Sequence, residues 1–279
     1  MSKRFENRVI LVTGAARGLG FAYSKCLVQQ GAIVAMQDGG VDQNGQNPDQ
    51  TVINAAAQSI GSDRVFPVSG LLNSRRDCAS LVGRVRDRFG RLDGLISNAG
   101  VVIWEPTTDV DQDTLRSSSA INHEASFWLC QEALPIMREQ NYGRIVLTSS
   151  GWAFGPYPGS EKLTLYCMSK GAQFGFGMAL AEGTGHPDIR VNVVAPIANT
   201  RIYASEVETG RLRPDSVAGT VAWLVSSDCD INGTVLKIAD GNISVLEMAE
   251  KASVFLGERS ADPVACGAEI RSLMNRAKP

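Results

Sequence analysis

Short apolar runs alternate with longer amphipathic segments along most of the chain. The apolar runs predict strands near residues 9–12, 33–37, 64–68, 94–97, 144–148, 190–194 and 234–238. The amphipathic segments predict helices near residues 18–30, 49–60, 74–89, 110–139, 164–183 and 214–227. This alternation is typical of α/β proteins, in which helices connect parallel strands. We therefore expect a Rossmann-type, doubly wound and mostly parallel seven-stranded sheet with helices on both faces.

Two segments depart from this alternation. Residues 39–50 are polar and rich in turn-forming residues, which predicts a loop. The expected single domain covers residues 1–242, and residues 243–279 form a helical extension beyond it. Within that extension, the run S-V-L-E-M-A-E-K-A-S-V-F-L at residues 244–256 has the amphipathic pattern of a helix. Such a helix docks on the domain or on another subunit, or it is a simple surface helix.

The charge balance excludes several classes of partner. The chain has 27 Lys and Arg against 29 Asp and Glu, a formal net charge of −2, with no block of like charge. We therefore expect no nucleic-acid partner. The apolar stretches have the length of strands, so no membrane span is expected. Two histidines without metal-ligand spacing predict no metal site.

The cysteines and the chain ends bear on location. Six cysteines are scattered without a C-x-x-C pair, which favours reduced thiols. The sequence starts without the apolar core of a secretory signal, and it ends in N-R-A-K-P rather than in the peroxisomal tripeptide S-K-L. We therefore expect a cytoplasmic protein.

A glycine-rich turn joins the first predicted strand to the first predicted helix, and it reads T-G-A-A-R-G-L-G over residues 13–20. Gly14 permits a tight turn. Gly18 and Gly20 let the backbone approach a pyrophosphate and let the helix pack on the strand. The start of the helix then offers free N–H groups to phosphates. Strand, turn and helix together predict a dinucleotide site, and the alternative is a glycine turn without a ligand.

Asp38, at the end of the second predicted strand, bears on the choice of dinucleotide. An acid at this place accepts hydrogen bonds from the adenosine ribose and repels a 2′-phosphate, which favours NAD over NADP. Arg17 in the glycine turn is the opposing signal, because it is able to reach a phosphate. The alternative for Asp38 is a turn residue before Gly39 and Gly40.

Tyr166 and Lys170 lie four residues apart in L-Y-C-M-S-K-G-A, a stretch expected to be helical. That spacing places both side chains on one helix face. A tyrosine exchanges protons poorly at neutral pH because its ordinary pKa is about 10. A neighbouring ammonium favours the phenolate and lowers that pKa. The pair is therefore a candidate acid/base unit for an alcohol oxygen, and the alternative is an ordinary tyrosine beside a solvated lysine.

With these motifs in one order, the chain resembles the short-chain dehydrogenase/reductase family over roughly residues 5–242. Further shared motifs are N-A-G, R-I-V-L-T-S-S, V-N-V-V-A-P and N-G-T-V-L-K-I-A-D-G at the ends of later strands. The resemblance implies reversible hydride transfer between NAD and a secondary alcohol or ketone, in a homodimer or homotetramer. The branch that it resembles most is the (3R)-hydroxyacyl-CoA dehydrogenase module of peroxisomal multifunctional β-oxidation enzymes, through Q-D-G-G, A-P-I-A-N-T-R and L-R-P-D-S-V-A-G-T-V-A-W-L.

The resemblance also implies roles for individual residues. Tyr166 is the base in oxidation and the acid in reduction, and Lys170 assists it and binds the nicotinamide ribose. Ser150 donates a hydrogen bond to the substrate oxygen. Asn122 holds a helix backbone carbonyl and a water that carries the proton onward from Lys170. The implied cofactor-binding set consists of Gly14, Arg17, Gly18, Leu19, Gly20, Asp38, Leu71, Leu72, Asn98, Ala99, Gly100, Tyr166, Lys170, Pro196, Ile197 and Thr200.

Three departures from the family pattern are visible. Ser150 and Tyr166 are sixteen residues apart, so the loop between them is longer than is usual in the family. The acid that holds the adenine amino group after the third strand is replaced by Leu71. The segment after Pro196, which contains Thr200, is compressed.

Aromatic residues are concentrated in the loops expected around Tyr166. They are Trp104 after the N-A-G motif, Trp152, Phe154 and Tyr157 on the lengthened loop, and Tyr203 after Thr200. These rings predict an open, apolar cleft for a bulky substrate, such as a hydroxyacyl thioester, a steroid, a terpenoid or an aryl alcohol. The alternative is that some of the rings only fix their loops to the body of the domain.

Two other functions remain open on the sequence. A relative that binds the nucleotide without turnover would act as a sensor or an assembly subunit, and the four filled catalytic positions argue against it. An epimerase or dehydratase that regenerates its cofactor internally would need a sugar-nucleotide domain, for which the chain leaves little room.

Overall fold

The computed structural model describes residues 4–42, 45–155, 157, 159–200 and 212–276. The substrate residue expected at position 203 lies outside these ranges. Residues 1–245 and residues 246–279 are two separate compact units. The first unit contains the sheet and the helices around it, and the second contains the last helix of the chain.

The first seven strands agree in place with the predicted apolar runs, and an eighth follows them. They are β1 (Val9–Thr13), β2 (Ile33–Asp38), β3 (Val65–Ser69), β4 (Gly94–Ser97), β5 (Gly143–Thr148), β6 (Ile189–Ile197), β7 (Val235–Ala239) and β8 (Asn242–Leu246). The helices are α1 (Gly18–Gln29), α2 (Thr51–Ile60), α3 (Arg75–Phe89), α4 (Gln112–Ser119), α5 (Ala125–Glu139), α6 (Thr164–Gly183), α7 (Asp215–Leu224) and α8 (Pro263–Arg276). Shorter 3₁₀ turns cover Gly151–Phe154, Ser160–Lys162 and Gly257–Ala261.

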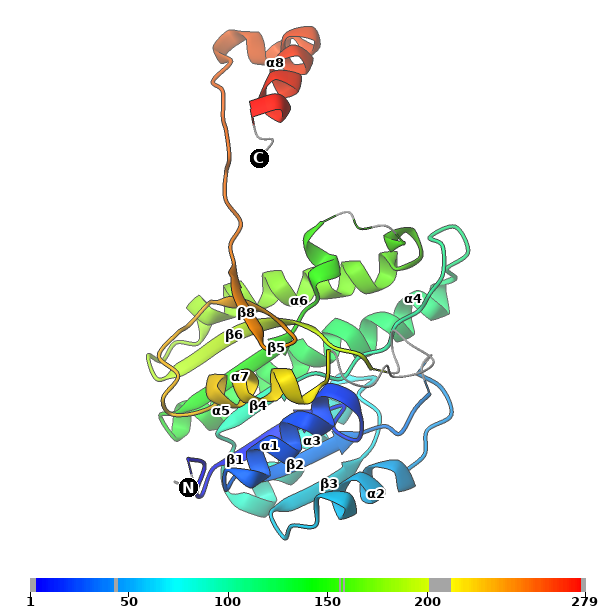
Figure 1. Cartoon of the computed structure of the whole chain (residues 1–279), viewed down its shortest axis with the longest axis vertical. Coiled ribbons are helices and arrows are strands. Elements are labelled where there is room, and N and C mark those ends of the chain that lie inside the picture. The colour runs from blue at the N-terminus through cyan, green and yellow to red at the C-terminus, as the bar shows by residue number, and fades with distance from the viewer. Residues whose placement is uncertain (1–3, 43–44, 156, 158, 201–211, 277–279) are drawn as a thin grey trace. The chain divides into compact units, whose positions relative to one another are not determined.

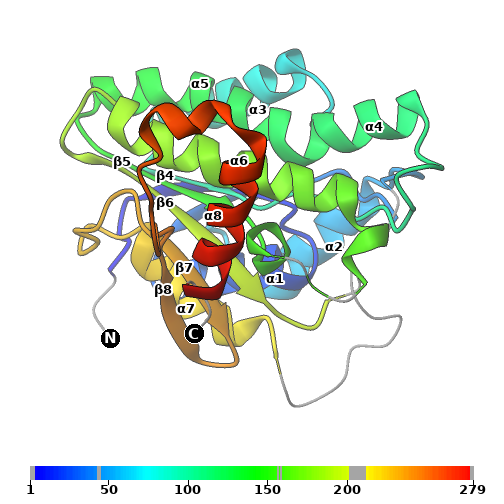
Figure 2. The ribbon, with the colours of Figure 1, turned by 90° about the horizontal axis from the view of Figure 1, so that it is seen from above.

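The sheet has the order β3-β2-β1-β4-β5-β6-β7-β8, and all strands from β1 to β7 pair in parallel. Figure 1 shows this sheet between its helices. Seen from above in Figure 2, α1, α2 and α7 lie on one side of the sheet and α3, α5 and α6 on the other. The prediction of a doubly wound, mostly parallel α/β fold is confirmed.

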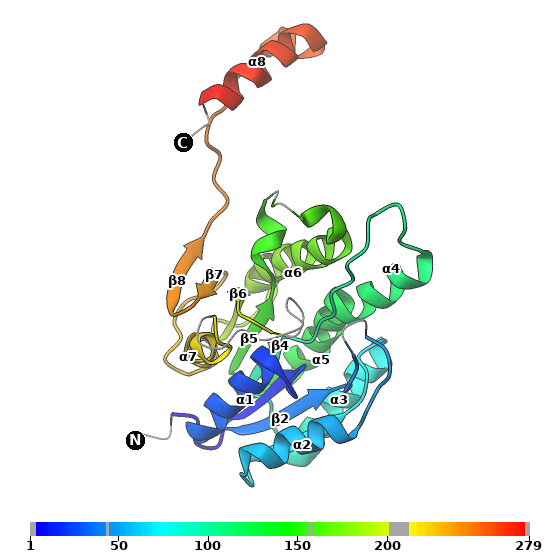
Figure 3. The ribbon, with the colours of Figure 1, turned by 45° about the vertical axis from the view of Figure 1, so that its right-hand side comes forward.

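The eighth strand is a correction to the predicted seven. Asp240 and Gly241 have φ angles of 48° and 81°, so they form a tight turn that reverses the chain after β7. Residues 242–246 then lie beside β7 at the edge of the sheet (Figure 3). The prediction of a helix over 244–256 is wrong, because β8 takes its first residues and 247–256 contain no helix. The helix of the extension begins instead at Pro263, a residue suited to the first helical position.

The segment predicted as one helix over 110–139 contains a wider turn. Residues 120–124 between α4 and α5 form a π-helical turn, in which the Ala125 N–H donates to the carbonyl of Ala120, five residues back. Such turns are rare and are frequent at functional sites. This one holds Asn122 and His123.

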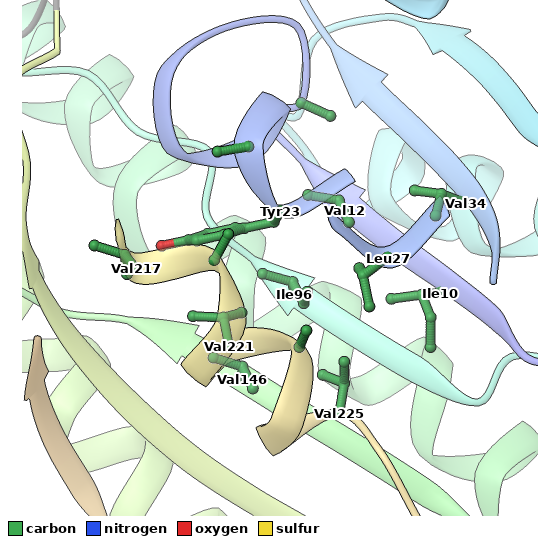
Figure 4. Packing of buried hydrophobic residues seen from close by; sticks show 14 of the residues in the cluster. Ile10, Val12, Tyr23, Leu27, Val34, Ile96, Val146, Val217, Val221 and Val225 are labelled. Atoms are coloured by element: carbon green, nitrogen blue, oxygen red, sulfur yellow. The ribbon is translucent and has the colours of Figure 1, made fainter. Parts of the chain in front are cut away.

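The main core lies between the sheet and the pair α1 and α7 (Figure 4). Tyr23 of α1 is completely buried there, and its hydroxyl points toward Val217 of α7. Within the described part of the chain the Tyr23 hydroxyl has no hydrogen-bond partner. Burial raises the pKa of Tyr23, so the group stays neutral.

We expect Tyr23→Phe to increase the free energy of unfolding by about 1 kcal/mol, because an unpaired buried hydroxyl costs stability. Thermal and urea unfolding measure the change. Tyr142→Phe is the matched control, since the Tyr142 ring packs under the guanidinium of Arg8, 3.9 Å from its centroid, and we expect no gain. A lower midpoint for Tyr23→Phe would show that its hydroxyl is paired in solution.

Candidate active site

The strand order reverses between β1 and β4, and open α/β sheets form their ligand crevice at such a point. A cleft lies at this place, at the carboxyl ends of the strands. Its lining includes most of the residues that the sequence predicted for a cofactor, namely Gly14, Arg17, Gly18, Leu19, Asp38, Leu71, Leu72, Asn98, Ala99, Gly100, Tyr166, Lys170, Pro196 and Thr200. The fold therefore brings both ends of the predicted site together.

Two predicted residues do not line the cleft. Gly20 packs against the carbonyl of Gly14, where a Cβ would collide, so it supports the turn rather than the ligand. Ile197 is 40% exposed at the end of β6 and lies outside the lining.

The glycine turn fits a pyrophosphate. Gly14 has a φ of 64°, and a Cβ on it would lie 2.9 Å from the Cα of Ala99. A Cβ on Gly18 would lie 3.2 Å from the methyl group of Thr200, across the cleft. No side chain caps the start of α1, and Gly18 and Leu19 of its first turn line the cleft, so this helix end is suited to receive an anionic group. The residues present are suited to hold a dinucleotide.

Thr13 and Asn98 join the ends of β1 and β4. The Thr13 hydroxyl accepts hydrogen bonds from the N–H groups of Asn98 and Ala99, each at 3.0 Å. The Asn98 side chain donates to the Thr13 carbonyl at 3.0 Å. These contacts hold the N-A-G segment against the glycine turn, a role of Thr13 that the motifs alone did not predict.

Asp38 is buried, and both of its carboxylate oxygens accept main-chain hydrogen bonds. One accepts from Ala16 at 2.9 Å and the other from Gly40 at 2.8 Å. Asp38 is thus a turn residue as well as part of the cleft lining. Arg17 donates to the carbonyl of Val41 at 3.2 Å, and Arg17, Asp38 and Val41 all line the cleft.

Gln37 is a cleft residue that sequence reasoning missed. Its amide accepts from the Gly14 N–H at 3.4 Å and donates to the Gly70 carbonyl at 2.6 Å. It therefore links the glycine turn to the end of β3. The sequence offered one indication of this role, because Gln37 directly precedes Asp38 at the end of β2.

The loop after β2 reaches the opposite wall of the cleft. A Cβ on Gly45 would lie 3.2 Å from Val101 and 3.6 Å from Ile121, and both of these residues line the cleft. The turn-rich composition of residues 39–50 predicted a loop, but it did not predict that the loop lies close to Val101 and Ile121.

Tyr166 and Lys170 lie one turn apart on α6 and line the cleft. The Lys170 ammonium lies 5.6 Å from the centroid of the Tyr166 ring and donates to the carbonyl of Thr148 at 2.7 Å. Lys170 is only 3% exposed, and this burial lowers its pKa to about 7. A lysine that titrates near neutral pH is suited to proton transfer with a neighbouring tyrosine.

The two serines after β5 have different environments. Ser150 accepts a hydrogen bond from the Trp152 N–H at 3.4 Å and so caps the 3₁₀ turn that follows. Ser149 donates to the carbonyl of Lys170 at 2.7 Å, which ties β5 to α6. Ser149 lines the cleft and Ser150 does not, although Ser150 is also buried.

Asn122 is completely buried in the π turn. Its side chain accepts from the Val101 N–H at 2.8 Å and donates to the Val101 carbonyl at 3.0 Å and to Ser118 at 3.1 Å. It therefore holds the segment that follows N-A-G, rather than a helix carbonyl as expected. Its own main-chain carbonyl accepts a hydrogen bond from the side chain of Gln173.

The expected aromatic residues fall into different groups. Trp152 packs on the small cluster of Val102, Leu163 and Tyr166, which places it beside Tyr166. Phe154 packs on Phe174 of α6 with 5.2 Å between ring centroids, so it fixes the loop to the helix. Tyr157 packs on Trp152 at 5.4 Å, and Trp104 is half exposed. None of these four rings lines the cleft.

Among the described residues, no three His, Cys, Asp or Glu side chains gather as metal ligands would. No helix in the same part of the chain has the length and apolar character needed to cross a membrane.

Comparisons with known proteins agree with the motifs. A family model described as short chain dehydrogenase matches residues 8–209. The peroxisomal multifunctional enzyme type 2 of Mus musculus is 30% identical over 263 residues, which are 92% of this chain and 35% of that protein. The 7alpha-hydroxysteroid dehydrogenase of Bacteroides fragilis is 28% identical over 260 residues, 87% of this chain and 96% of that protein.

A solved structure agrees as well. The crystal structure of a short chain dehydrogenase from Mycobacterium avium matches with a TM-score of 0.84 and 27% identity, over 99% of this chain and 97% of that one. The chain spans between 35% and 63% of the length of the multifunctional enzymes that it matches. The resemblance drawn from the motifs is confirmed, and the chain belongs to the short-chain dehydrogenase family.

Proposed function

We propose that the protein is an NAD-dependent oxidoreductase that interconverts a secondary alcohol and a ketone. The observation that carries the proposal is one cleft lined by the glycine turn at one end and by Tyr166 and Lys170 at the other. Members of this family generally bind NAD or NADP, and the bound nicotinamide accepts or supplies the hydride.

The residues of the chain manage the proton. Tyr166 takes the hydroxyl proton in oxidation and returns it in reduction. The Lys170 ammonium, 5.6 Å from the centroid of the Tyr166 ring, stabilises the phenolate, and water screens this attraction little because both residues are buried. Ser150 uses its oxygen as an acceptor for Trp152, so its hydroxyl proton is available to the substrate oxygen, where negative charge develops.

NAD is favoured over NADP by the buried carboxylate of Asp38. Its two oxygens retain further acceptor capacity for ribose hydroxyls beyond the bonds from Ala16 and Gly40. Arg17 donates one hydrogen bond to the carbonyl of Val41, so fewer of its N–H groups are available to a 2′-phosphate. Leu71 and Leu72 line the part of the cleft proposed for the adenine, so the adenine would pack on apolar side chains there instead of donating to an acid.

The substrate is an apolar or bulky alcohol, such as a hydroxyacyl thioester or a steroid. Trp152 beside Tyr166 supports this proposal. The names of relatives point the same way, since they include a hydroxysteroid dehydrogenase and multifunctional peroxisomal enzymes.

We further propose that the protein self-associates as a homodimer or homotetramer and is cytoplasmic. Ile243 and Val245 are 57% and 60% exposed on the edge strand β8, which is the kind of edge that another chain covers. Residues 247–279 are proposed to act as a docking extension in that assembly.

All six cysteines are free, in keeping with a reducing compartment. Sedimentation before and after removal of residues 247–279, and cell fractionation, test these proposals.

Tyr166→Phe should lower kcat by a factor of about 10² to 10⁴, because the phenyl ring keeps the packing but exchanges no proton. The dissociation constant for NADH, followed by fluorescence, should stay within about twofold of the parent value. Tyr142→Phe, outside the cleft, is the control and should leave both quantities unchanged. Full turnover by Tyr166→Phe over a panel of secondary alcohols contradicts the mechanism.

Asp38→Asn should reduce the ratio of kcat/KM for NAD over NADP by roughly tenfold, since the negative charge that repels a 2′-phosphate is removed at nearly constant shape. Arg17→Met should change the same ratio in the opposite direction. Steady-state kinetics with both cofactors give the ratios. A native preference for NADP would show that Arg17 outweighs Asp38.

Trp152→Ala should raise KM for bulky ketones about tenfold and for small ketones much less, because the ring lies beside Tyr166. Phe154→Ala is the matched variant, since that ring packs on Phe174, and it should affect all substrates alike. A KM series graded by substrate size separates the two variants. Equal responses would make Trp152 a structural residue only.

A further inference from the structure

A group of apolar side chains forms part of the lining of the cleft. Its members come from the loop after β2, the segment after β3, and the segment between β4 and the π turn together with that turn. They are Val41, Leu71, Leu72, Val101 and Ile121. Leu71 stands where the family pattern has an acid, so the chemistry of this group differs from that pattern.

Two glycines of the loop after β2 show where this apolar group lies. A Cβ on Gly39, the residue after Asp38, would lie 2.7 Å from Leu71 Cδ2. The Gly70 N–H donates to the main-chain carbonyl of Asp38 at 3.2 Å, which holds the segment before Leu71 at the same place. Further along the loop, a Cβ on Gly45 would lie 3.2 Å from Val101, in the opposite wall. The apolar group therefore begins directly beside Asp38.

Most polar side chains of the lining belong to other parts of the cleft. One set lies at the glycine turn, where an amide donates to the carbonyls of residues 13 and 14 and a methyl group faces Gly18. Another set surrounds Lys170 at the catalytic end. The first set consists of Asn98 and Thr200, and the second of Thr148, Ser149 and Tyr166.

The acceptors that lie beside Leu71 already have donors. The carbonyl of Gly70, the residue before Leu71, accepts from the Gln37 amide at 2.6 Å. The Gln37 Oε1 atom accepts from the Gly14 N–H, and Gln37 is only 3% exposed. The carboxylate of Asp38 accepts from two main-chain N–H groups, and its remaining capacity is assigned to the ribose in the proposed function.

The character of this region bears on the base of the dinucleotide. Adenine has an amino group that donates hydrogen bonds, whereas hypoxanthine has a carbonyl oxygen at the same ring position. A site built to hydrogen-bond a ligand group rejects the analogue that lacks it, because a buried polar group is then left unpaired. Apolar walls hold either flat ring by packing and discriminate weakly between them.

We propose that the protein selects its dinucleotide through the ribose and the pyrophosphate and not through the base, so that a hypoxanthine dinucleotide replaces NAD. This inference rests on the proposed function and deepens it. Leu71 is the residue that makes the site tolerant of the base, and Asp38 makes it selective at the ribose. The two residues meet at Gly39.

The first test compares NAD with nicotinamide hypoxanthine dinucleotide in the wild-type protein. The values of kcat/KM for the two dinucleotides should agree within about threefold, because packing on apolar side chains hardly distinguishes the two bases. The dissociation constants of the two reduced dinucleotides, followed by fluorescence, should agree within the same factor. A larger preference for NAD in both measurements overturns the inference.

The second test restores an acid beside the base. Leu71→Asp should raise the ratio of kcat/KM for NAD over the hypoxanthine dinucleotide by roughly tenfold, since the carboxylate accepts from the amino group and repels the carbonyl oxygen. Leu71→Asn is the matched variant, and its ratio should stay near that of the wild type, because an amide is able to donate or to accept. An unchanged ratio in Leu71→Asp overturns the inference, because the base then does not lie beside this residue.

A control variant places the same charge outside the cleft. Leu115 is 38% exposed on α4 and does not line the cleft, so Leu115→Asp should leave both the ratio and kcat unchanged. If Leu71→Asp does not fold, the comparison of the two dinucleotides in the wild type still decides the question.

The outcomes separate this inference from the proposed function. Binding of both reduced dinucleotides with similar affinity, without turnover of any secondary alcohol, contradicts the proposed oxidoreductase and supports the tolerance of the base. Turnover with NAD and a strong loss with the hypoxanthine dinucleotide overturns the tolerance alone. A wild type that binds neither dinucleotide contradicts both.

Discussion

The hydrogen bonds between Thr13 and the segment Asn98-Ala99 hold the carboxyl ends of β1 and β4 together. These strands are neighbours only because the chain returns to the centre of the sheet after β3. The glycine turn, the N-A-G segment and the wall at Val101 all take their positions from this junction. Gly14 must lack a side chain there, since Ala99 occupies the space. One reversal of strand order therefore produces both the crevice and the contacts that shape it.

The burial of Lys170 is the second constraint on the site. An ammonium taken out of water is stable only with good partners, and the structure supplies the Thr148 carbonyl on β5. Ser149 holds the main chain of Lys170 from the same strand. Burial disfavours the charged form and lowers the pKa of Lys170 to about 7. In the function that we propose, a lysine with this pKa is suited to exchange protons near neutral pH.

The π turn connects these two parts of the molecule. A regular helix over 110–139 would place Asn122 differently relative to Val101, whereas the wider turn brings its amide onto both main-chain groups of that residue. The same turn presents the Asn122 carbonyl to Gln173 of α6. Packing of α5 and α6 around this turn thus couples the wall of the cleft to the helix that carries Tyr166 and Lys170.

Local patterns determined much of this protein. Strand periodicity, the turn over residues 13–20 and the spacing of Tyr166 and Lys170 depend on near neighbours in the chain, so the sequence alone predicted the fold class and most of the cleft lining. It failed where a segment had a competing partner far away, as in β8, which pairs with β7 instead of forming a helix. Only the tertiary structure decided that Phe154 packs on α6, that Gln37 bridges two turns and that Gln173 meets Asn122, 51 residues away. Such partners are chosen by burial and by hydrogen bonding between distant elements, and neither is encoded in residue spacing.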